Sequence, residues 1–177
     1  MNLYLMRHAD ALPVGGAITR DVERRLSGRG EEDARIMGRA LSLLGPGVNI
    51  IVTSPLTRAR ETGAILGREI GNNPLLHVSE HLAPGLREVS LFRELIALGG
   101  GSDIVAIGHL PDISHFVSFL IGRGGSAAVA MSAGTVAKLV IEEGRPQGHL
   151  AWLLSPETVR NFLVRSEGNH ESPDDVD

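Results

Sequence analysis

Short apolar runs alternate with amphipathic segments along most of the chain. The first run, residues 3–6, is too short for a helix and is followed at once by Arg7 and His8, which is typical of a buried strand that ends at a sheet edge. Similar runs predict five further strands, at residues 49–53, 75–78, 104–107, 135–142 and 149–154.

Helical spacing of apolar residues predicts four helices between these strands. Ser27 is a suitable N-cap for the first, which we expect to end at Gly45 and Pro46. In the second, Ser54 and Pro55 fit the N-cap and first helical position, and Gly71 fits the end. The third covers residues 89–96 and ends at the glycines 99–101, and the fourth follows residues 108–111 and runs to about residue 121.

This alternation predicts an α/β three-layer sandwich, in which a mostly parallel central sheet has helices on both faces. The last two strands, joined through residues 144–148, predict an antiparallel edge. We expect residues 1–165 to form a single domain. Residues 166–177 hold five acidic residues and no lysine or arginine, so we expect a disordered acidic tail.

Composition excludes several classes of partner. The formal net charge is −4, but without the acidic tail the chain has 17 basic and 16 acidic residues, which is no basic footprint for nucleic acid. Aromatic residues make up only 3% of the chain, too few for base-stacking platforms. No apolar run is long enough to span a bilayer, and the absence of cysteine is compatible with a cytoplasmic location. We expect neither a nucleic-acid nor a membrane partner.

The candidate chemistry lies where strands end. His8 and His109 each follow an apolar strand, Arg7 precedes His8, and Arg58 lies just beyond the strand at 49–53. Ligands bind at the carboxyl ends of strands in such sheets, and two guanidiniums suit a phosphate or phosphoryl group. A histidine can attack phosphorus, and a second can stabilise the oxygens by hydrogen bonding. The loop at residues 12–25 is long enough to border this site. Arg58 could instead form a surface ion pair with Glu61.

Other chemistries fit the residues less well. The chain has no Walker-type glycine loop, and Lys138 is its only lysine. His109, Asp112 and His115 lie close in sequence but lack the one-turn spacing of a His-x-x-x-His metal site. A non-catalytic phosphoprotein-binding module would need the arginines but no nucleophile. Activity in the presence of a chelator, and trapping of a covalent intermediate, separate these alternatives.

Three separated motifs resemble the histidine phosphatase superfamily, the fold of phosphoglycerate mutases. They are Leu-Tyr-Leu-Met-Arg-His-Ala at residues 3–9, Ser-Pro-Leu-Thr-Arg-Ala-Arg-Glu-Thr at 54–62, and Gly-His at 108–109. Within the superfamily, the chain most resembles the SixA-like phosphohistidine phosphatase branch. The features that it shares with this branch are its small size, the sequence Arg-His-Ala-Asp-Ala and the sequence Gly-His-Leu-Pro. The resemblance extends from residue 3 to about residue 155.

The resemblance implies a role for each matching residue. His8 would be the nucleophile that becomes phosphohistidine, and Arg7 and Arg58 would bind the phosphoryl oxygens. His109 would complete the pocket, together with the backbone N–H of Leu110. No metal or other cofactor is implied. The substrate would be a phosphorylated signalling protein, such as a phosphotransfer domain, or a small phosphate ester.

Two departures from the superfamily pattern bear on the substrate. Ala9 stands where glycine is commonest, which is tolerable if the backbone there keeps a negative φ. The carboxylate that usually protonates the leaving oxygen has no clear counterpart, and the candidates are Glu80, His81, Asp10 and Glu88. Phosphohistidine can carry a proton on its far ring nitrogen, so that the imidazole leaves as a neutral group. A site without a clear general acid therefore favours cleavage of a P–N bond over cleavage of a P–O bond. A small-molecule phosphomonoesterase or mutase is the alternative.

Overall fold

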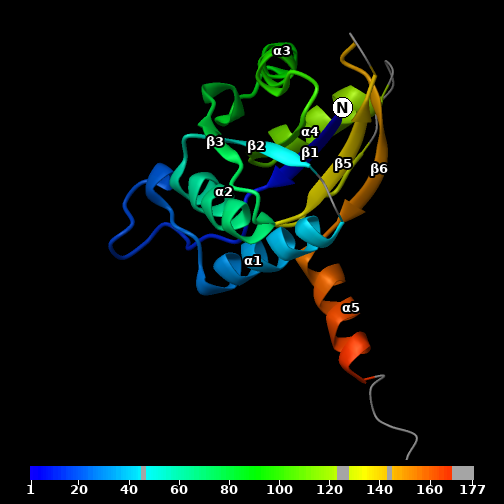
Figure 1. The fold of residues 1–177 in the computed structure, drawn as a ribbon. Coiled ribbons are helices and arrows are strands. Elements are labelled where there is room, and N and C mark those ends of the chain that lie inside the picture. The colour runs from blue at the N-terminus through cyan, green and yellow to red at the C-terminus, as the bar shows by residue number, and fades with distance from the viewer. Residues whose placement is uncertain (45–46, 123–127, 143–144, 169–177) are drawn as a thin grey trace, which may run out of the picture.

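A single six-stranded sheet forms the centre of the protein (Figure 1). The computed structural model describes residues 1–44, 47–122, 128–142 and 145–168. The strands are β1 (Asn2–Arg7), β2 (Val48–Thr53), β3 (Leu75–Val78), β4 (Asp103–Gly108), β5 (Val136–Ile141) and β6 (Gly148–Leu154), in the order β3-β2-β4-β1-β5-β6. β1 to β4 are parallel, whereas β5 is antiparallel to both of its neighbours.

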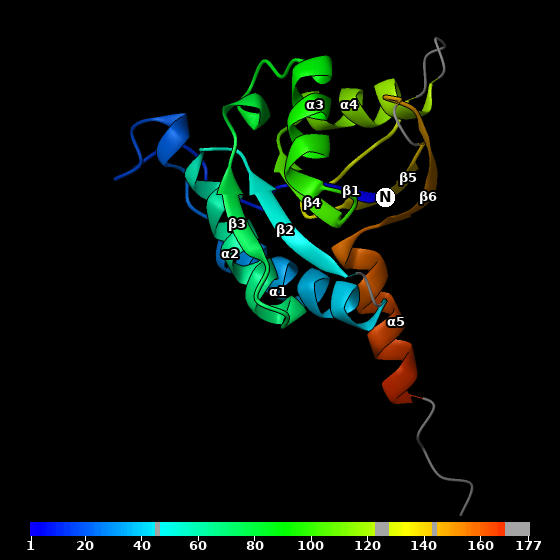
Figure 2. The same ribbon diagram turned by 45° about the horizontal axis from the view of Figure 1, so that its top comes forward.

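Helices cover both faces of this sheet, as Figure 2 shows. They are α1 (Gly28–Leu43), α2 (Thr57–Ile70), α3 (Glu88–Gly99), α4 (Asp112–Ile121) and α5 (Pro156–Gly168). Buried side chains of α3 and α4 pack on one face with Leu3 and Leu5, and those of α1 and α2 pack on the other with Tyr4 and Met6. Alternate residues of β1 therefore face opposite cores, as expected for a buried strand.

The structure confirms the predicted α/β three-layer architecture and all six predicted strands. Ser27 is the N-cap of α1, and its hydroxyl accepts a hydrogen bond from the Gly30 N–H. Gly71 ends α2 with a left-handed φ of 87°. The predicted end of α1 at residues 45–46 lies outside the described residues.

Two boundaries differ from the prediction. α2 begins at Thr57 rather than at Pro55, because Leu56 is still extended. The Ser54 hydroxyl accepts from the Leu56 N–H and also contacts His109, so it does not cap the helix at the predicted position. Residues beyond 155, for which no helix was predicted, form α5, and the Ser155 hydroxyl accepts from the Thr158 N–H at its start.

The parallel register brings three strand ends to one rim. Arg7 of β1 lies beside Gly108 of β4, and Thr53 of β2 lies beside Ile107. The backbone continues this pairing past the strands, since the His8 N–H donates to the Gly108 carbonyl at 3.0 Å. The residues that follow these strands therefore share one edge of the sheet.

The C-terminal helix marks the limit of the described chain. α5 runs to Gly168, and the rest of the predicted acidic tail, residues 169–177, lies outside the described residues. Among the helices that are described, none is both long and apolar enough to cross a membrane.

Candidate active site

His8 lies directly after β1 and is buried, with 8% of its surface exposed. Its Nδ1 lies 2.7 Å from the Ala9 carbonyl oxygen, and its Nε2 lies 3.2 Å from Arg58 Nε. The carbonyl can only accept and the guanidinium can only donate, so the ring proton is on Nδ1 and Nε2 carries a lone pair. This tautomer leaves Nε2 as the nucleophilic atom.

The surroundings of His8 keep its ring neutral. Burial lowers the pKa of His8 to about 4, although the hydrogen bond to the Ala9 carbonyl opposes this shift. The positive charges of Arg58 and Arg7 lower the pKa further. An imidazole with this pKa is unprotonated at neutral pH and so retains its nucleophilic lone pair.

Arg58 lies in the first turn of α2 and is 5% exposed. Its Nη1 donates to the Asp21 carbonyl oxygen at 2.8 Å, and its Nη2 donates to Asp21 Oδ2 at 3.0 Å. The ion pair with Glu61 that the sequence allowed is not formed, because Arg58 turns inward. Glu61 instead accepts from Arg25 Nε at 2.7 Å and from the Leu26 N–H at 2.8 Å.

Asp21 is a site residue that the sequence did not single out. It belongs to η1 (Asp21–Glu23), a short 3-10 turn within the long loop that was expected to border the site. Burial raises the pKa of Asp21, but hydrogen bonds and charges from Arg24 and Arg58 lower it below its usual value overall. Asp21 is therefore a carboxylate that orients Arg58. The sequence signal that could have indicated this role is the presence of an acidic residue inside the loop that borders the site.

His109 follows β4 and is 4% exposed. Its Nε2 lies 2.8 Å from the hydroxyl of Ser54, which itself accepts from the Leu56 N–H at 3.3 Å. The Ser54 hydroxyl can donate its proton to Nε2, and in that tautomer the ring proton of His109 is on Nδ1. Burial lowers the pKa of His109 to about 3, and the nearby His8 and Arg58 lower it as well. The rings of His8 and His109 are 5.0 Å apart.

Two buried nitrogens at this site have no hydrogen-bond partner among the described residues. They are Arg7 Nε and His109 Nδ1. Arg7 Nη1 donates to the Met131 carbonyl oxygen at 3.1 Å, and burial lowers the pKa of Arg7. Unpaired buried polar groups cost about 1–3 kcal/mol each, so they are rare unless a ligand satisfies them. These two nitrogens mark Arg7 and His109 as candidates for contact with a ligand.

The backbone after His8 is held from several sides. The Ala9 N–H donates to Thr62 Oγ1 at 3.2 Å, and that hydroxyl donates to the Arg58 carbonyl at 2.7 Å. Gly30 at the start of α1 packs so closely that a Cβ there would overlap the Asp10 carbonyl oxygen. Asn73 is the one non-glycine residue with positive φ in the described part, so Ala9 has the negative φ that its side chain requires.

None of the other sequence candidates for a proton donor forms a hydrogen bond or ion pair with either histidine among the described residues. The carboxylate of Asp10 accepts from the Ser27 hydroxyl at 2.6 Å, at the start of α1. Glu80 and His81 are exposed on the short turn η2 (Glu80–Leu82), and Glu88 begins α3. Leu110, whose backbone N–H was expected to bind phosphoryl oxygen, follows His109 and is 41% exposed.

The metal-site alternative gains no support from the geometry. Within residues 1–44, 47–122, 128–142 and 145–168, no three His, Cys, Asp or Glu side chains form a group that could hold a metal ion. Asp112, one of the sequence candidates, instead accepts from the Gly85 N–H at 2.8 Å.

Comparison with known proteins gives consistent matches. The family model of the histidine phosphatase superfamily (branch 1) matches residues 3–94. An uncharacterised protein of Picosynechococcus sp. is 31% identical over 140 residues, which cover 77% of this chain and 83% of that protein. Its sequence similarity extends over most of both proteins.

Solved structures agree in fold. The protein histidine phosphatase SixA in complex with tungstate has a TM-score of 0.80 at 24% identity, covering 90% of this chain and 99% of that one. A Nakamurella multipartitia protein named for phosphohistidine phosphatase SixA has a TM-score of 0.71 at 26% identity, covering 88% and 95%. Phosphoserine phosphatase from Entamoeba histolytica has a TM-score of 0.63 at 15% identity, covering 89% and 98%. These structures agree with the chain in fold, and the family match over residues 3–94 shows that the chain belongs to the histidine phosphatase superfamily.

Proposed function

We propose that this protein is a phosphatase that acts through a phosphorylated His8 and that its substrate is phosphohistidine on a signalling protein in the cytoplasm. The observation that carries the proposal is the state of His8. Its Nδ1 proton is engaged by the Ala9 carbonyl, and its unprotonated Nε2 faces Arg58. A neutral, oriented imidazole beside a guanidinium is what attack on a phosphoryl group requires.

The first chemical step transfers the phosphoryl group to His8. Nε2 of His8 forms a bond to phosphorus while the P–N bond of the substrate breaks, and the substrate imidazole leaves as a neutral ring that keeps its distal proton. Arg7, Arg58 and the Nδ1–H of His109 stabilise the charge on the three phosphoryl oxygens. Each such donor contributes about 10²- to 10³-fold in rate.

The second step returns the enzyme to its starting state. Water attacks phosphorus, the bond to Nε2 breaks, and inorganic phosphate forms. The proton released by water goes to phosphate oxygen or to solvent. Throughout, the Ala9 carbonyl holds the proton on Nδ1, so His8 leaves as the same neutral tautomer that attacked.

The preference for a P–N bond rests on the placement of the carboxylates. The carboxylate of Asp10 is engaged by the Ser27 hydroxyl at 2.6 Å, and Glu80 is exposed on η2. Asp21 contacts Arg58, but its pKa is lowered, which makes it a poor proton donor. An alkoxide leaving group needs such a donor, whereas a protonated phosphoimidazole does not.

The test compares substrates of the two bond types. We expect a higher kcat/KM for a phosphotransfer domain phosphorylated on histidine than for phosphoserine or a sugar phosphate, with activity unchanged by a chelator and lost in His8→Ala. Faster ester cleavage would establish the alternative, a small-molecule phosphomonoesterase or mutase. Binding of phosphoprotein without any turnover would establish the non-catalytic module.

A further inference from the structure

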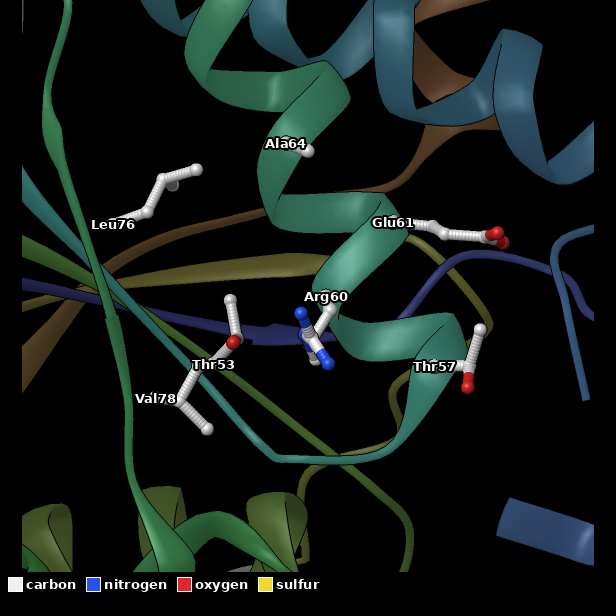
Figure 3. Close-up of a pocket in the computed structure, with 7 residues that line it drawn as sticks. All are labelled: Thr53, Thr57, Arg60, Glu61, Ala64, Leu76 and Val78. Atoms are coloured by element: carbon white, nitrogen blue, oxygen red, sulfur yellow. The ribbon is translucent and has the colours of Figure 1, made fainter. Parts of the chain in front are cut away.

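A pocket lies beside the candidate active site, between α2 and β3. It has a volume of about 560 Å³ and is lined by Thr53, Thr57, Arg60, Glu61, Ala64, Leu76 and Val78 (Figure 3). Thr53 ends β2 and is followed by Ser54, the residue that contacts His109. The pocket therefore opens next to the rim that carries the two histidines.

The floor of this pocket is apolar and belongs to an edge strand. β3 is at the end of the strand order, and within the described chain it pairs with β2 alone. The register places Val78 beside Thr53 and Leu76 beside Ile51, so these side chains face α2. Leu76 and Val78 are 51% and 48% exposed, although they lie on the side of the sheet that a helix normally covers.

The pocket also contains a guanidinium with no partner in the described part of the chain. Arg60 is exposed on α2, two residues after Arg58, and its side chain forms no hydrogen bond or ion pair with a described residue. The acid beside it is already neutralised, because Glu61 accepts from Arg25 and from the Leu26 N–H. Figure 3 shows Glu61 directed away from Leu76, on the other side of α2.

We propose that this groove docks the protein substrate through a carboxylate held by Arg60 and an adjacent apolar side chain seated on Leu76 and Val78. The proposal rests on the proposed function, since it gives a phosphoprotein a second contact beside the phosphoryl site. Charge complementarity selects an acidic segment, and the apolar floor distinguishes a peptide from a free anion. The outer edge of β3 adds backbone groups that an extended segment can pair with.

Two substrates test the proposal. One is a panel of phosphotransfer domains phosphorylated on histidine, and the other is phosphoramidate, a P–N compound too small to reach the groove. For Arg60→Glu we expect the KM of the phosphorylated domains to rise about tenfold, the change that corresponds to losing one contact of about 1.4 kcal/mol. The kinetic constants for phosphoramidate stay at their wild-type values.

Further variants separate docking from general effects. Ala64→Phe fills the groove without changing charge and should raise the same KM, while Arg60→Lys keeps the charge and should raise it less. Arg93→Glu, an exposed arginine on α3 at the other face of the sheet, makes the same charge change and should leave both substrates unaffected.

The outcomes distinguish failure of docking from failure of the proposed function. If the wild-type protein dephosphorylates the domains but Arg60→Glu and Ala64→Phe do so with unchanged KM, the docking proposal is overturned and the proposed function stands. The same holds if both substrates are affected equally. If the wild-type protein turns over esters but none of the domains, the proposed function is overturned and the docking proposal with it.

Discussion

Replacing Thr62 with valine tests how the protein holds His8, the proposed nucleophile. Valine keeps the shape of threonine and removes only the hydroxyl, which joins the Ala9 N–H to the Arg58 carbonyl at 3.2 and 2.7 Å. Thr62 is fully buried, so the Ala9 N–H loses its partner with no water to replace it. The Ala9 carbonyl that orients His8 belongs to the residue that is released.

The magnitude follows from the two effects. An unsatisfied buried N–H costs about 2 kcal/mol, which in a chain of this length lowers Tm by about 4–8 °C. Because misplacement of a reacting group by about 1 Å can reduce the rate about 10²-fold, we expect kcat to fall by about ten- to a hundredfold. The assays are thermal unfolding and steady-state turnover of phosphoramidate.

The matched control is Thr62→Ser, which keeps the hydroxyl and loses a methyl group. It should cost about 0.8 kcal/mol of stability yet retain most of the activity. If Thr62→Val loses stability but not kcat, or if Thr62→Ser loses as much kcat as Thr62→Val, the hydroxyl does not position His8 and the reasoning is refuted.

Three further predictions concern the neighbours of the two histidines. Ser54→Ala frees His109 to place its proton on either nitrogen, so kcat should fall about tenfold with little change in KM; steady-state kinetics check this, and an unchanged kcat would contradict it. Asp21→Ala leaves the buried Arg58 without its carboxylate partner, so urea unfolding should show a loss of about 1–3 kcal/mol, while kcat/KM should fall several-fold as Arg58 loses its orientation. Because the pKa values of His8 and His109 in the folded protein are about 4 and about 3, below the usual 6.5, the unfolded chain takes up protons first as pH falls. Stability from these histidines is therefore complete above pH 6.5 and should decline below it, by up to about 1.4 kcal/mol per pH unit for each; urea unfolding of His8→Gln should show a shallower decline, and an equal decline would contradict the assignment.

The strands and the rim were predictable because buried parallel strands are short, continuous apolar runs whose ends are visible in the sequence. β1 and β4 each end at a histidine, and strand ends of a parallel sheet meet at one edge. β4 lies between β1 and β2 in the sheet. This order depends on pairing between strands that are far apart in the sequence. Only the fold resemblance could anticipate it.

Contacts between distant residues were not predictable from local patterns. Asp21 reaches Arg58 across 37 positions from a loop that has no hydrophobic period. The start of α2 was misplaced because Ser54, a good N-cap by residue type, is used by His109 instead. The helix α5 had a readable start signal in Ser155 and Pro156, but the sequence analysis assigned no element to the residues after the last strand.

The most direct test of the account is to identify the atom that carries the phosphoryl group during turnover. The enzyme is mixed with a labelled phosphohistidine domain, quenched in alkali and analysed by mass spectrometry. The account predicts an acid-labile, alkali-stable phosphoryl group on Nε2 of His8, absent from His8→Ala. A group on Nδ1 of His8, on His109, or equally abundant in the His8→Ala variant would contradict it.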